Sequence, residues 1–124
     1  LVRGNCSLVT KNLPENCRMR VSAIIDRYLE HSRIFVFAGG GVEKVYIGSA
    51  DWMPRNLDNR IEVIAPVYDP TLKLEMKRIV EYGLRDVRQG RLVDGSGENL
   101  PWTCDEPLET GSQQALYDYY NENR

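Results

Sequence analysis

The sequence has little of the chemistry that disulfide frameworks, zinc sites and membrane spans require. Three cysteines, Cys6, Cys17 and Cys104, form no Cys-x-x-Cys pair, which argues against a disulfide framework. A single histidine, His31, leaves too few ligands for a typical zinc site. No apolar run approaches the roughly 18 residues of a membrane span, and the start LVRGNCSLV lacks the regions of a signal peptide. These absences favour a protein of the reducing cytoplasm, compatible at most with peripheral membrane association.

The length and composition of the chain suit one ordinary globular domain. The chain has 124 residues, of which 42% are hydrophobic and 27% are charged. These values suit a single globular domain that covers residues 1–124. Because the chain begins at Leu1 rather than Met, we expect it to be an excised piece of a longer protein, which can hold only part of an active site.

The basic residues are unevenly placed. Residues 1–62 hold nine Lys and Arg against seven Asp and Glu, and seven of those nine cations are arginine. The planar fork of arginine binds phosphate through two hydrogen bonds at once, so phosphate recognition is one interpretation. The other interpretation is that these are ordinary surface arginines with no ligand. The net charge of −2 argues against a broad nucleic-acid surface.

Apolar patterns predict a mixed sheet with helices packed on it, in the α/β (mixed α+β) class. The expected strands are Val2–Val9, Arg18–Ile25, Ile34–Phe37, Val45–Ile47, Ile61–Val67 and Arg88–Val93. The run at 34–37 is continuously apolar and the segment at 61–67 is apolar on both faces, which predicts strands covered on both faces. Residues 26–31 are expected to form a helical turn, and residues 94–111 an acidic loop.

Two helices are expected in the second half of the chain. Asp69 and Pro70 are typical of a helix N-terminus, the first as cap and the second in the first turn. Apolar residues then recur on one helical face as far as Gly83. Ser112 predicts the cap of a last helix near the end of the chain.

Glycines at 39–41 separate two of the strands, which predicts a β-hairpin. A turn centred near Gly41 and Val42 would set Phe37 opposite Tyr46. The same register brings His31 to the segment that contains Asp51, because cross-strand neighbours lie only about 5 Å apart. The carboxylate of Asp51 would then orient the imidazole and favour its protonated form. A lone histidine is otherwise a surface or structural residue.

Two short motifs surround this histidine. His31-x-Arg33, followed by Gly48-Ser49-x-Asp51, resembles a degenerate form of the phospholipase D motif. In the full motif, H-x-K is followed by an aspartate and then by G-S-x-N. Here Arg33 replaces the lysine, Asp51 replaces the asparagine, and the intervening aspartate is missing. The match suggests phosphoryl chemistry but does not support phosphodiester cleavage.

A longer motif is far more specific. The stretch SADWMPRNLDNRIE, residues 49–62, resembles the signature S-A-D-W-M-x-R-N-L-D-x-R-x-E of type 1 polyphosphate kinases at every fixed position. LVRG at 1–4, YLEHSR at 28–33 and the Asp-Pro at 69–70 with its helix resemble other motifs of that family. The resemblance covers about residues 1–92, and residues 94–111 carry no transferable motif.

This resemblance implies the last domain of a four-domain bacterial enzyme with paired phospholipase D-like halves. Such an enzyme reversibly moves the γ-phosphate of ATP onto inorganic polyphosphate through a phosphohistidine. The phosphorylated histidine and the arginines associated with Mg²⁺ belong to the preceding domain of the same chain. This fragment alone is therefore expected to be inactive, with no metal ligand of its own, and the full-length protein is expected to form oligomers.

Three positions match family residues that contact ATP or phosphate, namely Arg3, His31 and Arg60. His31 also matches the second active-site histidine, which assists transfer as an acid or an electrostatic group. Phosphoryl transfer depends mostly on positioning and charge stabilisation, which arginines and a protonated histidine can supply.

Several neighbours are expected to support that site. Asp51 would orient the histidine, and Trp52 and Met53 would pack beneath it. Arg33 and Arg55 would either add to the positive field or simply pair with nearby carboxylates, such as those of Glu30 and Asp58. Two other functions stay open, a phosphodiesterase of the related fold and a non-catalytic polyanion-binding or assembly module.

Overall fold

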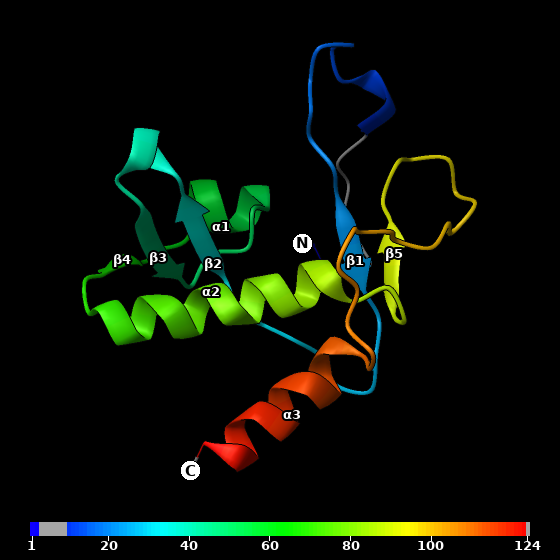
Figure 1. The fold of residues 1–124 in the computed structure, drawn as a ribbon. Coiled ribbons are helices and arrows are strands. Elements are labelled where there is room, and N and C mark those ends of the chain that lie inside the picture. Colours follow the sequence, from blue (N-terminus) through cyan, green and yellow to red (C-terminus); the bar gives the residue numbers. More distant parts are fainter. Residues whose placement is uncertain (3–9, 124) are drawn as a thin grey trace. The chain divides into compact units, whose positions relative to one another are not determined.

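The computed structural model describes residues 1–2 and 10–123 (Figure 1). The chain divides into two compact units, which are described separately. One contains Leu1–Glu30 and Val80–Arg124, and the other contains His31–Ile79. Each unit contains both strands and helical residues, as expected for a mixed α+β chain.

The unit formed by residues 31–79 is built on a three-stranded antiparallel sheet. Its strands are β2 (Ile34–Phe37), β3 (Lys44–Gly48) and β4 (Ile64–Val67), in the order β2-β3-β4. The central strand supplies the best-buried side chain, because Val45 is only 1% exposed. Figure 1 shows helix α2 running beside this sheet.

The predicted hairpin is present, but its predicted register is wrong. Phe35, not Phe37, lies opposite Tyr46. The reversal falls on the glycines themselves, in the 3-10 turn η2 (Gly39–Gly41), where all three residues have positive φ. Since glycine adopts such φ values without steric cost, the turn centres one position earlier than expected. The cross-strand partner of each residue changes by two positions, an even number, so each side chain keeps its predicted face of the sheet.

The expectation that the strands at 34–37 and 61–67 are covered on both faces is also wrong for this chain. Phe37 is 55% exposed and Ile64 is 57% exposed. Both β2 and β4 are edge strands, each of which pairs only with β3. Strand β4 is also shorter than the apolar run, since Ile61 is fully exposed and lies before it.

Two helices belong wholly or partly to the same unit. The short helix α1 (Pro54–Asn59) has proline in its first turn, as helix starts allow. Helix α2 (Pro70–Arg85) begins as predicted, because the amide of Leu72 donates a 2.9 Å hydrogen bond to the Asp69 carboxylate. An ion pair of 3.0 Å joins Lys77 of α2 to Glu43, at the start of β3.

The other unit holds a two-stranded antiparallel sheet, β1 (Ser22–Ile24) with β5 (Gly90–Leu92). Val2 adds one parallel bridge to Ala23. The rest of the expected first strand, including Arg3, lies outside the described residues. The short 3-10 turn η1 (Thr10–Asn12) follows that segment.

The core of this unit depends on a tryptophan in the predicted acidic loop. Trp102 is 5% exposed, and its indole N–H donates a 2.7 Å hydrogen bond to the carbonyl of Leu84. The guanidinium of Arg20 lies 4.2 Å from the centre of the indole ring. Gly90 packs closely here, because a Cβ at this position would lie 2.1 Å from the carbonyl oxygen of Asp86. Trp102 is therefore part of the core, although residues 95–101 of the same loop are exposed.

A buried aspartate organises the last helix. Asp86 is fully buried and accepts hydrogen bonds from the amides of Arg88, Gln89 and Ser112, at 3.0, 2.8 and 2.7 Å. Helix α3 (Ser112–Glu122) starts where this carboxylate meets the backbone. The helix was predicted correctly but its cap was not, since Gly111 is the N-cap and the Ser112 hydroxyl has no described partner.

The helical turn expected over residues 26–31 is absent. These residues form a bend and extended chain. Gln113 of α3 holds the bend, because its side chain accepts from the amide of Tyr28 at 3.0 Å and donates to the Tyr28 carbonyl at 2.7 Å. Among residues 1–2 and 10–123, no helix is long and apolar enough to cross a membrane.

Candidate functional site

Two of the motifs, H-x-R and G-S-x-D, meet at one end of the three-stranded sheet. Arg33 lies just before β2, and Asp51 lies three residues after β3. The Nε–H and Nη2–H groups of Arg33 both meet Oδ1 of Asp51, at 3.0 and 2.9 Å. The Nη1–H group donates to the carbonyl oxygen of His31 at 3.1 Å. The sheet register thus brings the H-x-R and G-S-x-D motifs together.

The carboxylate of Asp51 does not serve the residue that the sequence suggested. It was expected to orient the imidazole of His31, but it pairs with Arg33. The His31 side chain is exposed and has no hydrogen bond or ion pair among the described residues. Arginine takes the carboxylate because its long side chain can present two donors to one oxygen. The expected partner of Arg33, Glu30, instead accepts a hydrogen bond from Gln113 at 3.0 Å.

A second cluster ties the two ends of the signature segment together. Oε1 of Glu62 accepts a 2.8 Å hydrogen bond from Asn56, and Oε2 accepts a short hydrogen bond from the hydroxyl of Ser49. The same hydroxyl accepts a 3.0 Å hydrogen bond from the amide of Val63. Asn56 is only 3% exposed. The segment from 49 to 63 is therefore a closed loop rather than a free one.

The pKa of Glu62 is lowered by two hydrogen bonds and by the charges of two arginines. The hydrogen bond from Ser49 contributes most to lowering the pKa of Glu62 below its ordinary value, followed by the hydrogen bond from Asn56. The positive charges of Arg60 and Arg33 lower this pKa further. Arg60 follows α1 as its C-cap and is exposed. The hydrogen bonds from Ser49 and Asn56 therefore outweigh the two arginines in holding Glu62 as an anion.

Trp52 and Met53 do not pack beneath the site as expected. Trp52 is 78% exposed and Met53 is 41% exposed. The indole instead stacks on Phe35, with ring centres 6.1 Å apart and planes 21° apart. It thereby extends an aromatic face of the sheet, on which Phe37 and Tyr46 also meet edge to face at 6.0 Å.

This aromatic face lines a shallow pocket of about 470 Å³. Its walls are Phe35, Phe37, Gly39, Lys44, Tyr46, Trp52 and Ile64. The pocket is mainly apolar, and its one basic residue is Lys44, so its surface does not have the character of a phosphate site. Neither Arg33 nor Asp51 lines this pocket, although Trp52 follows Asp51 directly in the sequence.

The two other arginines of interest contribute less to the described geometry. Arg55 is exposed on α1 and has no ion pair among residues 10–123, so the pairing with Asp58 is not formed. Arg3 lies outside the described residues. The structure therefore joins Arg33 to Asp51 and to the backbone of His31, whereas among residues 10–123 no hydrogen bond or ion pair joins the Arg60 side chain to them.

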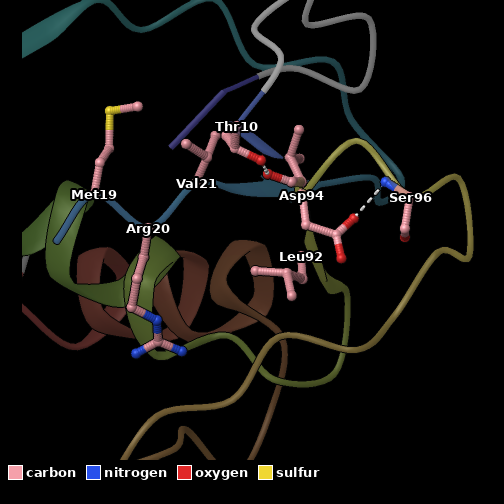
Figure 2. A pocket seen from close by; sticks show the side chains of 8 residues that line it. Thr10, Met19, Arg20, Val21, Leu92, Asp94 and Ser96 are labelled. Carbon is pink, nitrogen blue, oxygen red and sulfur yellow. Dashed lines mark hydrogen bonds between the residues drawn. The ribbon is translucent and has the colours of Figure 1, made fainter. Parts of the chain in front are cut away.

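Another pocket lies in the other unit, next to β1 and β5 (Figure 2). It has a volume of about 430 Å³ and is lined by Thr10, Met19, Arg20, Val21, Leu92, Val93, Asp94 and Ser96. Figure 2 shows Arg20 extending away from Asp94, and its guanidinium donates to the Thr103 carbonyl at 2.8 Å. The backbone amide of Ser96, and then its hydroxyl, lower the pKa of Asp94 and favour its anionic form. A carboxylate without a free cation disfavours phosphate, so this pocket is not the candidate site.

The metal-binding capacity of the described chain is small. Across residues 1–2 and 10–123, no three side chains of His, Cys, Asp or Glu come together in a metal-binding group. The acidic groups near the site are already engaged, Asp51 by Arg33 and Glu62 by Ser49 and Asn56. The residues present therefore do not fit a Mg²⁺ site by themselves.

The signature segment and its folded arrangement agree with comparisons to known proteins. Over residues 1–113 the sequence matches the family described as "Polyphosphate kinase C-terminal domain 2". This chain belongs to the polyphosphate kinase family. The polyphosphate kinase of Klebsiella pneumoniae is 43% identical over 119 residues, which cover 96% of this chain and 17% of that protein. The polyphosphate kinase of Synechocystis sp. is 44% identical over 119 residues, which cover 94% of this chain and 16% of that protein.

A solved polyphosphate kinase has the same fold. The crystal structure of polyphosphate kinase from Porphyromonas gingivalis matches with a TM-score of 0.80 and 43% identity, over 90% of this chain and 17% of that chain. The mixed α+β, phospholipase D-like class predicted from the sequence is confirmed. The strands nevertheless form two small antiparallel sheets rather than one mixed sheet. The chain spans only 17% of the length of these kinases.

The polyphosphate kinase signature contains residues whose role sequence reasoning missed. Ser49, Asn56 and Glu62 were matched as letters of the motif but were given no task. In the structure they form the hydrogen-bonded loop closure. The available signal was their polarity at fixed positions in a segment with no regular period, which indicates local side-chain to backbone bonding.

Proposed function

We propose that this chain is the last domain of a longer polyphosphate kinase and supplies half of its catalytic site. The enzyme would reversibly transfer the γ-phosphate of ATP onto inorganic polyphosphate. Membership of the family supports this proposal. Because the chain covers only 17% of its relatives, the phosphohistidine and the ligands for Mg²⁺ are assigned to the preceding part of the same polypeptide.

In this proposal Arg3, His31 and Arg60 bind the phosphates of ATP and polyphosphate. The exposed imidazole of His31 is available to a ligand, and so is the exposed guanidinium of Arg60. His31 acts beside the transferred phosphoryl group as an acid or an electrostatic group. Arg55 is a candidate supporting cation on α1. These groups can neutralise charge that develops on phosphate oxygens during transfer.

The electrostatic stabilisation that these groups could give the transition state is large enough to change the rate by orders of magnitude. One pair of opposite charges 4 Å apart is worth roughly 4 kcal/mol at an effective dielectric near 20, before desolvation. Each 1.4 kcal/mol retained in the transition state is about a tenfold gain in rate. Two arginines and one histidine around a phosphate chain would therefore contribute substantially once the full-length enzyme excludes water.

One observation carries the proposal most directly. The loop at 49–63 carries Arg60 and is closed by hydrogen bonds among Ser49, Asn56 and Glu62. Its Asp51 is joined through Arg33 to the backbone of His31, so that His31 and the loop that carries Arg60 lie at the same end of the sheet. Exposed cationic groups that gather at one end of a sheet are what a polyanion site requires.

The assignment of roles can be tested in the full-length kinase incubated with radiolabelled ATP. We expect a phosphohistidine that maps by mass spectrometry outside residues 1–124. A stable phosphohistidine on His31 would overturn the assignment. The Arg60→Ala variant should raise the KM for ATP, whereas Arg18→Ala, which removes an exposed arginine that no motif assigns to the site, should not.

A further inference from the structure

The guanidinium of Arg33 is already committed within the protein. Its Nε–H and Nη2–H groups face one carboxylate oxygen of Asp51, and its Nη1–H group faces the His31 carbonyl. The side chains of Arg33 and Asp51 are only 26% and 29% exposed. The backbone adds a further tie, because the amide of Gly48 donates to the Arg33 carbonyl at 2.9 Å.

These contacts conflict with a phosphate-binding role for Arg33. An arginine binds phosphate best by presenting two parallel N–H groups on one edge of the guanidinium. Asp51 occupies the edge formed by Nε and Nη2. A carboxylate at that edge also cancels the positive charge that a phosphate would seek. Arg33 is therefore poorly placed to hold a substrate oxygen.

The same contacts fix the backbone around His31. Residues 29–33 precede β2 and belong to no helix or strand. The His31 carbonyl accepts its described hydrogen bond from Arg33, and that side chain is anchored in turn to Asp51. A segment without regular structure is thereby joined to the turn after β3, where the signature segment begins.

We infer that Arg33 and Asp51 are positioning residues that hold His31 in place for phosphoryl transfer. They act through the backbone of His31 and do not contact substrate. This inference rests on the proposed function, because it assumes that His31 meets the transferred phosphate. The two motifs then act together, because the arginine of H-x-R binds the aspartate of G-S-x-D and so fixes the backbone of His31.

Steady-state kinetics of the full-length kinase can separate positioning from binding. Arg33→Lys keeps the charge but cannot make all three contacts, and Asp51→Asn keeps the shape but removes the charge. We expect each variant to lower kcat by on the order of 10–100-fold, the range that misplacement of a catalytic group can cost. The KM for ATP should change less than about threefold, since no substrate contact is lost.

The double variant provides a stricter measure. If both residues act through one contact, Arg33→Lys with Asp51→Asn should be no slower than the slower single variant. The matched control is Arg18→Lys, which changes an exposed arginine that no motif assigns to the site and should leave kcat and KM at their wild-type values. Circular dichroism melting curves of every variant show whether the fold is retained, and Asp51→Asn is the variant least able to disturb packing.

Two results would overturn the inference. In one, Arg33→Lys raises the KM for ATP while Asp51→Asn does not, as expected if the guanidinium binds phosphate. In the other, both variants keep the wild-type kcat. The outcome remains distinct from failure of the proposed function, because only the latter predicts that His31→Ala is itself active. An inactive His31→Ala with fully active Arg33 and Asp51 variants would reject positioning alone.

Discussion

Asn56 donates a 2.8 Å hydrogen bond to Glu62, six residues further along the chain. The amide is buried and the carboxylate is bound from its other side by the Ser49 hydroxyl. This arrangement closes the loop that contains both Asp51 and Arg60. The signature of the family is therefore partly a folding device, because three of its fixed polar residues hold the segment that carries the candidate site.

The first prediction concerns the pH dependence that Glu62 brings. Its folded pKa lies below the ordinary value of 4.5, chiefly through Ser49. A depressed folded pKa stabilises the fold above the unfolded pKa, and this contribution disappears as pH falls through the folded pKa. The stability gap between the wild type and Glu62→Gln should therefore shrink on acidification below about pH 4.5.

Urea unfolding at pH 7 and at several lower values measures this gap. Glu15→Gln is the control, because Glu15 is exposed and has no described hydrogen bond. A gap between wild type and Glu62→Gln that stays constant with pH would contradict the lowered pKa.

A second prediction concerns Asp86, which joins three backbone amides in the interior. Asp86→Ala removes a charged acceptor and leaves these amides unpaired, at 3.0, 2.8 and 2.7 Å from the lost oxygens. The free energy of unfolding should fall by about 3 kcal/mol, because each lost bond to a charged group costs roughly 1.5–3 kcal/mol with partial relaxation. Thermal or denaturant unfolding measures this change.

The matched control is Asp105→Ala, which removes an exposed aspartate from the neighbouring loop. It should change stability by less than about 0.5 kcal/mol. Equal effects of the two substitutions would show that the buried carboxylate does not organise the start of α3.

A third prediction separates the two tryptophans. Trp52 is 78% exposed, whereas Trp102 is 5% exposed. Acrylamide should quench the fluorescence of Trp52 strongly, so the Trp52→Phe variant should retain only the poorly quenched emission of Trp102. Quenching that is unchanged in Trp52→Phe would mean that the indole is covered.

The same residues differ in their effect on stability. Trp102→Ala should cost about 3–5 kcal/mol, the range for large buried side chains. Trp52→Ala should cost about 1 kcal/mol, since it loses mainly its stacking on Phe35. Similar losses in the two variants would contradict the burial found here.

Local signals in the sequence predicted much of the fold. Asp69 and Pro70 marked the start of α2 because capping depends on neighbours a few residues away. The buried role of Trp102 could not be predicted in that way, because its indole reaches Leu84, 18 residues earlier. The hairpin register depended on the φ values of three glycines, which composition does not specify.

The sequence predicted that His31 and Asp51 lie at one end of the hairpin, but it did not predict which side chain binds the Asp51 carboxylate. The hairpin argument placed His31 near Asp51, and the structure joins the two through Arg33. Nothing in the sequence ranks an arginine over a histidine as partner of one carboxylate. That choice follows from side-chain length and donor geometry in the folded chain. The roles of Arg3, His31 and Arg60 as phosphate-binding groups stay predictions.

The most direct test of the account is the rate of polyphosphate synthesis by full-length kinase that carries His31→Ala. We predict a loss of at least about 100-fold in kcat, the lower range for a group that takes part in proton transfer or charge stabilisation. The melting temperature should stay near that of the wild type, because the imidazole is exposed and has no described partner. Synthesis at a near-normal rate by a folded variant would contradict the central claim.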